Sequence, residues 1–359
     1  MLEFVKETKS CWDFLRETKL PVFIYGMGNG AEKILRQFDR CGIPVAGFFA
    51  SDEFVRGHYF KGHLVHSLSQ IESIIDDFII VLGFGAGYRS LYDRIVELSK
   101  KHPFYAPDLP VYDEEVFDVE YMNAHAEEIQ AVYDLLADER SRELYASIIN
   151  YRLSGKIEYL LGSESLVSED YSDIIKPTAD SVFCDLGAFN GDTVTEFFTA
   201  ANGIYSKIIA VEPSEKNFRR LQKNMEELGF DNVELVNAAA EDFDGVIDFS
   251  AGSGRMQSVL CENGDSLRQT PAIKADTLLE GITAPIIIKY DVEGGEQSAL
   301  IGSEKSIKNG AKLVVSLYHK TGDIFTIPLW INKLVPDRKL YIRKRLYIPA
   351  WDVNLIVLP

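Results

Sequence analysis

Short runs of apolar, β-branched residues recur along this chain, and the clearest of them end in an acid or a glycine turn. Such runs are too short for helices and are typical of buried parallel strands, which deliver polar groups at their carboxyl ends. Two strand–turn–helix–strand patterns stand out, one beginning at residue 22 and the other at residue 182. They predict an α/β fold with two tandem Rossmann-like, doubly wound domains.

The same reading gives the individual elements. In the first half we expect strands at 22–25, 45–49 and 77–82, with helices near 32–40 and 88–100. In the second half we expect helices near 193–200 and 216–228, and strands at 182–184, 207–211, 233–237, 246–250, 258–260, 286–290 and 312–317. The last two strands, 339–348 and 352–358, are predicted to form an antiparallel hairpin around Pro349.

The stretch between the two halves has a different pattern. From residue 113 to about 156 there is no strand pattern, and apolar residues such as Ile129 and Val132 recur at helical spacing. Three prolines between 103 and 110 end the first half. We therefore predict a domain at 1–110, a helical connector at 111–164 and a domain at 165–359. Whether the connector caps the ligand edge of the second domain is left open by the sequence.

Composition and charge narrow the class of partner. The chain has 37 basic and 55 acidic residues, a net charge of −18, and 46% apolar residues. This charge repels phosphate backbones and anionic lipid, so neither nucleic acid nor a membrane is expected as the main partner. No apolar run approaches ~18 residues, and the first residues lack the apolar core of a signal peptide. With scattered cysteines (Cys11, Cys41, Cys184 and Cys261), the chain is expected to be cytoplasmic with reduced thiols; the sequence does not predict its oligomeric state.

The turn after residue 184 points to a particular cofactor. Asp185 precedes Gly187 by two residues, and the next glycine is Gly191, a D-x-G-x-x-x-G pattern rather than the dinucleotide pattern G-x-G-x-x-G. A carboxylate beside the turn would repel a pyrophosphate. It suits S-adenosylmethionine, which carries a cationic ammonium and a sulfonium but no phosphate.

Each part of that cofactor has a candidate partner in the sequence. Asp185 is expected to hold the methionyl ammonium, directly or through water, and Glu212 to bind both ribose hydroxyls. Asn237 or Asp242 is expected at the adenine edge, and the sequence does not choose between them. The backbone N–H groups of the turn are expected to meet the methionyl carboxylate, along Gly187, Asn190, Gly191 and Asp192.

Four segments carry a resemblance to a known family: Asp185–Ala188 with Gly191-Asp192, Val211–Pro213, Ile288–Glu296 and Ser316–His319. In this order, and at these intervals, they resemble the FkbM family of S-adenosylmethionine-dependent O-methyltransferases over residues 165–359. Tyr290 and Gly295 depart from the usual family residues without removing a polar group. The resemblance implies a class I methyltransferase sheet and an acceptor that is a sugar or another hydroxylated small molecule.

The catalytic candidates lie after two later strands. Asp291 and Glu293 are two residues apart at a strand end and are expected to point to the same side, toward the transferred methyl group and the acceptor. His319 follows the strand at 312–317, and its unperturbed pKa near ~6.5 would suit a general base. Two carboxylates and a histidine could also bind a divalent metal, but no third clustered acid is evident, so no metal is expected.

The first glycine turn carries a weaker pattern. Gly26, Gly28 and a later Asp52 fit G-x-G-x-x-A with a following acid. Together with residues 45–52 and 62–65, this turn is similar to the nucleotide-sugar-binding N-terminal domain of bacterial sugar acetyltransferases. The resemblance implies a bound nucleotide or nucleotide-linked sugar, and a domain that kept only the fold is the equal alternative. The contrasting function for the whole chain is a non-catalytic binding protein with two Rossmann-like domains.

Overall fold

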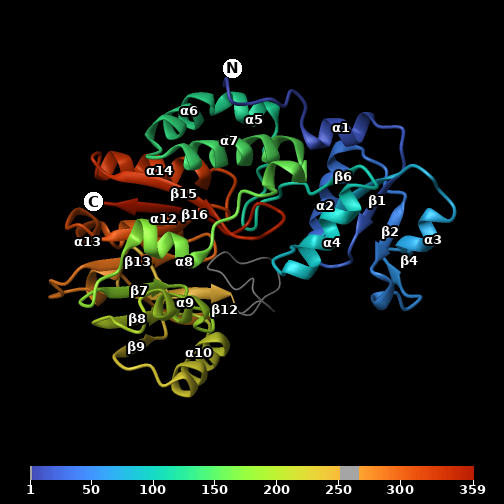
Figure 1. Ribbon diagram of the computed structural model, residues 1–359. Helices are drawn as coiled ribbons and strands as arrows, with labels where there is room; N and C mark the ends of the chain where they lie inside the picture. The colour runs from blue at the N-terminus through green and yellow to red at the C-terminus, as the bar shows by residue number, and fades with distance from the viewer. Residues whose placement is uncertain (1, 251–266) are drawn as a thin grey trace.

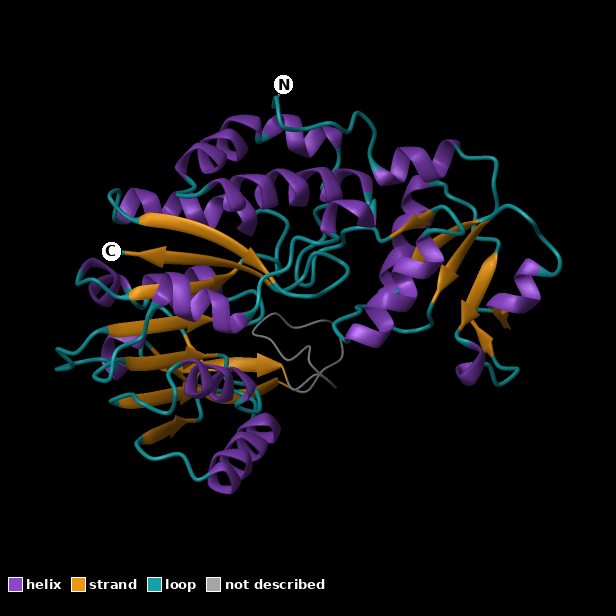
Figure 2. Ribbon diagram, viewed as in Figure 1, coloured by secondary structure: helices purple, strands orange, loops and turns teal. Residues whose placement is uncertain are grey.

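The structure is a computed structural model that describes residues 2–250 and 267–359. The strand expected at 258–260, the glycine turn at 252–254 and Cys261 lie outside the described residues. Two large sheets, each flanked by helices, stand side by side in the molecule (Figure 1; Figure 2). The prediction of an α/β fold with two Rossmann-like units is confirmed.

The first sheet has six strands in the order β3-β4-β2-β1-β5-β6, all parallel except the β3–β4 pair. Its strands are β1 (Val22–Tyr25), β2 (Gly47–Ala50), β3 (Tyr59–Phe60), β4 (His63–Ser67), β5 (Ile79–Leu82) and β6 (Phe104–Tyr105). Its helices are α1 (Cys11–Glu17), α2 (Asn29–Cys41), α3 (Leu68–Glu72) and α4 (Arg89–Ser99). The two-residue strands β3 and β6 were not predicted, because they are too short to show a period.

The second sheet has seven strands in the order β15-β16-β14-β13-β7-β8-β9, with β16 antiparallel to both neighbours. Its strands are β7 (Val182–Leu186), β8 (Lys207–Val211), β9 (Val233–Val236), β13 (Ile286–Tyr290), β14 (Lys312–Ser316), β15 (Lys339–Lys344) and β16 (Val353–Leu358). The predicted terminal hairpin is therefore present. A small third sheet holds β10 (Ala239–Ala240), β11 (Gly245–Ser250) and β12 (Leu267–Ile273).

The helices of the second half bring the strand ends together at one edge. They are α9 (Asp192–Ala200), α10 (Glu215–Leu228), α11 (Ala275–Leu278), α12 (Glu296–Ile301), α13 (Glu304–Lys308) and α14 (Asp323–Leu334). Helix α14 was not predicted, since Pro328 in its interior argues against a helix. The turns after β7, β8, β13 and β14 all open at the same edge of the sheet, because these four strands are parallel.

The connector contains α5 (Val119–Ala124), α6 (Ala126–Leu135) and α7 (Glu139–Ser154), followed by short turns of helix at Ile157–Leu160, Val167–Glu169 (α8) and Asp170–Ile175. Figure 1 shows its helices along the outer side of the second sheet, where α6 packs against α14 and α7 against β15. The buried guanidinium of Arg152 donates to the carbonyls of Thr321 (2.9 Å) and Leu317 (3.3 Å). Because one apolar cluster includes residues of both sheets and the connector, the boundaries at 110 and 164 stay predictions. No helix in the described ranges is long and apolar enough to cross a membrane.

Candidate active site

The glycine turn between β7 and α9 is fastened to its own protein neighbours. Gly187 and Ala188 donate their N–H groups to Val211 O (both 2.9 Å), and Phe189 donates to Glu212 Oε2 (2.9 Å). The N–H groups of Gly191, Asp192 and Thr193 also have protein acceptors. We expected these groups to bind the carboxylate of a cofactor. In the structure the turn uses most of these groups to attach itself to β8 and to begin α9, and their contact with a cofactor carboxylate stays a prediction.

Asp185 lies beneath the turn and not on its surface. It is fully buried, accepts a hydrogen bond from Thr193 Oγ1, and its Oδ1 is 3.8 Å from Lys289 Nζ. Burial raises the pKa of Asp185, and the charge of Lys289 opposes that rise. In this arrangement Lys289, on β13, supplies a cationic neighbour for Asp185, and a contact of Asp185 with a cofactor ammonium, directly or through water, stays a prediction.

Glu212 follows β8 and accepts hydrogen bonds from the turn after β7 and from the turn after β8. Its oxygens accept hydrogen bonds from the N–H groups of Phe189 and Ser214 (2.8 Å), and it is 6% exposed. Burial raises its pKa to about 7. Asn237 donates its side-chain amide to Glu212 O (2.8 Å) and so braces the same turn, whereas Asp242 is exposed. Contacts of these residues with ribose or adenine stay predictions.

A buried histidine and three acids form a cluster beyond the carboxyl ends of β13 and β14. Glu296, at the start of α12, accepts from the N–H of Val292 (3.0 Å) and lies 2.8 Å from His319 Nδ1. The other ring nitrogen, Nε2, is 3.5 Å from Asp291 Oδ1 and 3.6 Å from Glu293 Oε2. Among the described residues, Nε2 has no hydrogen-bond partner. The structure thus brings the predicted trio together and adds Glu296 to it.

Burial and the charged groups of this cluster shift the pKa values of its members. Burial alone would lower the pKa of His319, but Glu296, Asp291 and Glu293 outweigh burial and raise it to about 9. His319 is therefore protonated at neutral pH, and the expectation that it is a base with an ordinary pKa is corrected. Burial raises the pKa of Glu293 to about 7, although His319 opposes the rise. Lys289 and His319 overcome the effect of burial on Asp291 and hold the pKa of its carboxyl below the usual value.

Two tyrosines orient the acids, and the sequence analysis missed both. Tyr318, next to His319, donates its hydroxyl to Asp291 Oδ1 (3.1 Å). Tyr112, in the connector, donates to Glu293 Oε2 (2.7 Å), and its own N–H donates to His319 O (3.1 Å). Tyr318 was detectable as part of the Ser316–His319 segment. Tyr112 carried no signal, because it is 181 residues from its partner.

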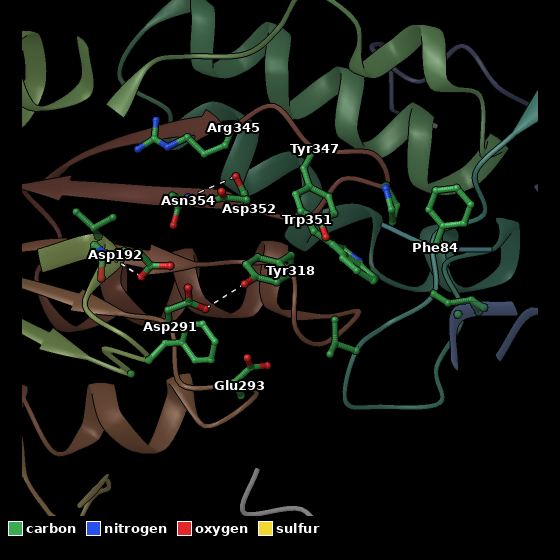
Figure 3. Close-up of a pocket in the computed structure, with 18 of the residues that line it drawn as sticks. Phe84, Asp192, Asp291, Glu293, Tyr318, Arg345, Tyr347, Trp351, Asp352 and Asn354 are labelled. Atoms are coloured by element: carbon green, nitrogen blue, oxygen red, sulfur yellow. Dashed lines mark hydrogen bonds between the residues drawn. The ribbon is translucent and has the colours of Figure 1, made fainter. Parts of the chain in front are cut away.

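A cavity of about 460 Å³ opens in front of these groups (Figure 3). Its walls combine the glycine turn and α9, the acids after β13, and the loop between β15 and β16. In Figure 3, Tyr318, Tyr347 and Trp351 lie between Asp291 on one side and Phe84 on the other. The cavity therefore joins the edge of the second sheet to the first unit, which contributes Asn29, Gly30, Lys33, Gly83 and Phe84.

Comparison with known proteins agrees with this geometry. Residues 185–340 match the family model for the methyltransferase FkbM domain. The chain carries an FkbM methyltransferase domain. The match begins at Asp185, in β7, and ends in β15, so it spans the sheet edge and the acid cluster. The FkbM domain is a methyltransferase domain that depends on S-adenosylmethionine.

One solved structure shows the same fold over nearly the whole chain. The methyltransferase FkbM from Methylobacillus flagellatus KT matches with a TM-score of 0.72 at 18% identity, over 96% of this chain and 92% of that one. An rRNA methylase from Streptococcus thermophilus matches at 14% identity with a TM-score of 0.35, over 54% of this chain and 90% of its own. A Streptococcus mutans protein in complex with SAH matches at 14% identity with a TM-score of 0.32, over 50% and 88%. No curated protein matches the sequence.

The acid cluster of the FkbM domain also bears on the metal question. Ligand atoms of Asp291, Glu296 and His319 lie within 4.8 Å of one another, a group that has Glu296 in the place of Glu293 from the sequence analysis. In the structure Glu296 is hydrogen-bonded to the imidazole and His319 carries a proton at neutral pH. The metal-free interpretation stays a prediction, and chelation tests it below.

The first glycine turn lies partly at the cavity. Gly26 has a φ of +115° and packs against Phe84, and Gly28 is the N-cap of α2. The residues that line the cavity are the next ones in the chain, Asn29 and Gly30. Asp52 starts a short 3-10 helix and does not line the cavity. Binding of a nucleotide by Gly26, Gly28 and Asp52 stays a prediction.

Gly187 should tolerate alanine poorly, for a reason internal to the FkbM domain. Its φ is +88°, and a Cβ there would lie 2.0 Å from Asp291 O. We expect Gly187→Ala to lower the free energy of unfolding by about 2–3 kcal/mol through left-handed strain and a displaced β13 loop. Gly281→Ala is the matched control, since its φ is +77° and a Cβ would meet no described atom within 4 Å. Equal losses for both variants in urea denaturation would contradict the close-approach argument.

Proposed function

We propose that the chain is an O-methyltransferase that uses S-adenosylmethionine and methylates a hydroxyl group of a sugar or another hydroxylated small molecule. The observation that carries the proposal is Glu293. It lies on the cavity wall, its side chain is 35% exposed, and burial raises its pKa to about 7. A hydroxyl acceptor must lose a proton as it is methylated, and a group with this pKa can take that proton at neutral pH.

The residues of the cavity fit the cofactor in charge and size. A volume of about 460 Å³ lies in the usual range for small-molecule sites. Asp192, Asp291 and Glu293 line it with negative charge, which suits a ligand with an ammonium and a sulfonium. S-Adenosylmethionine supplies an electrophilic methyl group when it is bound.

The proposed roles in the reaction follow from position. Glu293 accepts the proton of the acceptor hydroxyl while the new C–O bond forms and the C–S bond breaks, which leaves a methyl ether and SAH. Tyr112 and His319 hold the carboxylate of Glu293 in place. Asp291 stays ionised between Lys289, His319 and Tyr318, so it contributes charge and orientation. Orientation of the hydroxyl toward the methyl group supplies much of the rate.

The choice of a sugar rests on the aromatic part of the cavity. Tyr318, Tyr347 and Trp351 offer flat apolar faces, and the indole N–H of Trp351 is buried without a hydrogen-bond partner among the described residues. A ring that carries hydroxyl groups would cover the apolar faces. At the far end of the cavity, the N-terminus of α2 and Lys33 offer positive potential, which would suit the phosphates of a nucleotide-linked sugar.

The deciding experiment supplies the purified chain with labelled S-adenosylmethionine and with uridine or thymidine diphosphate sugars, free sugars or no acceptor. We expect acceptor-dependent transfer of label to a methyl ether, which mass spectrometry locates on a hydroxyl oxygen. Activity that persists in a chelator supports the metal-free interpretation. If calorimetry finds no binding of S-adenosylmethionine or SAH at millimolar concentration, the proposed function is wrong.

The pH dependence of the reaction should report Glu293. Its carboxyl accepts a proton only when it is ionised, so kcat/KM should rise with pH and level off above an apparent pKa of about 7. An unperturbed glutamate would give a midpoint near ~4.3. A pH–rate profile that is flat between pH 5.5 and 8 would contradict this assignment.

A further inference from the structure

Most of the backbone donors expected for the cofactor carboxylate are already used within the protein. Six backbone N–H groups of that turn already donate to protein acceptors, those of Gly187, Ala188, Phe189, Gly191, Asp192 and Thr193. Binding a carboxylate there would require breaking the bonds that join the turn to β8 and cap α9. Among the described hydrogen bonds of the turn, only the N–H of Asn190 has no acceptor, so we expect the anionic end of S-adenosylmethionine to bind a second donor on another element.

Lys289 is a donor in the right place. It lies on β13 opposite Asp185 of β7 and lines the cavity beside Gly187, Phe189, Asp192 and Thr193. Its Nζ is 3.3 Å from Asp291 Oδ2, which accepts a hydrogen bond, and 3.8 Å from Asp185 Oδ1, which is beyond hydrogen-bond distance. An ammonium has three donors, so Lys289 has more donor capacity than the described residues use.

The other cation of this wall, Arg345, binds protein groups through Nη1. Arg345 donates to the buried carboxylate of Asp170 and to Ser165 Oγ (3.1 Å). Lys289 is buried, with 10% of its side chain exposed, so an ion pair with a ligand there would be screened little by water. The acids of the same wall remain for the ammonium of the cofactor.

We propose that Lys289 binds the α-carboxylate of S-adenosylmethionine and thereby makes the FkbM domain discriminate between amino-acid and decarboxylated forms of the cofactor. This inference rests on the proposed use of S-adenosylmethionine. It assigns to one side chain the charged contact that the turn does not supply, and it gives Asp185 the role of fixing Lys289. Lys289 is in these terms a specificity-determining residue, whereas Asp185 is a positioning residue.

The test compares binding of S-adenosylmethionine with binding of its decarboxylated derivative by calorimetry. For the wild type we expect the intact cofactor to bind about 10- to 100-fold more tightly, the usual effect of a charged hydrogen bond. Lys289→Met should reduce this ratio to nearly one. Lys216→Met is the matched control, because it removes an exposed cation of α10 that does not line the cavity and should leave the ratio unchanged.

A second variant protects the test from misfolding. Lys289→Met leaves the buried Asp185 without its cationic partner, so we pair it with Asp185→Asn, which removes the charge and keeps an acceptor for Thr193. The double variant should fold, by circular dichroism, and also lose the discrimination. A wild-type ratio near one, or an unchanged ratio in the folded double variant, would overturn the inference. Absence of binding of either compound to the wild type would instead refute the proposed function.

Discussion

Glu293→Gln is expected to lower kcat by about 10²- to 10⁴-fold, the range typical for loss of a general base. Glutamine has nearly the shape of glutamate and can still accept the hydrogen bond that Tyr112 donates to Glu293 Oε2. What it lacks is the ability to take a proton from the acceptor hydroxyl. Affinity for S-adenosylmethionine should change little, because the substitution acts on the acceptor side of the cavity.

The measurement is steady-state kinetics together with calorimetry on the same preparation. Glu280→Gln is the control, since it changes an exposed glutamate in the turn before β13 and should keep wild-type kcat. The residual activity of Glu293→Gln should also lose the rise of kcat/KM with pH. A variant that retains wild-type kcat would show that the proton leaves by another route.

His319→Leu is expected to lower the free energy of unfolding by about 3–5 kcal/mol at pH 7, the cost of removing one partner of a buried charge pair. The carboxylate of Glu296 is only 1% exposed and would lose its contact with the imidazolium. Asp291 and Glu293 would lose their shared positive neighbour as well. Adding Glu296→Gln should recover part of the loss, because it removes the buried charge and keeps an acceptor for Val292 N–H.

Wild type and His319→Leu also test the direction in which stability depends on pH. The pKa of His319 is raised in the folded state to about 9 from an ordinary value near ~6.5. Its contribution to stability is therefore complete below about pH 6.5 and is lost as pH rises through about 9. The difference in unfolding free energy between wild type and His319→Leu should shrink across that range in urea titrations. A difference of less than 1 kcal/mol at pH 7, or one that grows toward pH 10, would contradict a buried imidazolium.

The sequence predicted the fold well because the pattern of the strands is local. Runs such as 182–184 and 286–290 are apolar at nearly every position, so both faces of those strands had to be covered by helices. The terminal hairpin was readable for the same reason. Some missed elements were too short for a period, as in β3 and β6, and α14 with its internal proline was contrary to propensity. The strands β4 and β12 were also missed.

The sequence predicted which residues lie together at the site better than it predicted what each residue does there. Asp291, Glu293 and His319 were chosen because the carboxyl ends of β13 and β14 meet at one edge, and the structure places them together. Their protonation depends on burial and on Glu296, and neither quantity can be read from spacing. The contacts of Gly187 and Asp185 within the protein were not predicted for a related reason, since a pattern shows which residues lie at a turn and not whether their hydrogen bonds are already used.

The bond from Tyr112 to Glu293 has a consequence for anyone who would move this site into another protein. The FkbM match spans residues 185–340, yet the neighbour that orients its proposed base comes from the segment just after β6. A chimera joined at residue 165 would keep the second sheet, but a residue of the other protein would replace Tyr112. The junction of such a chimera should therefore lie upstream of Tyr112, so that the connector and the second half come from the same protein.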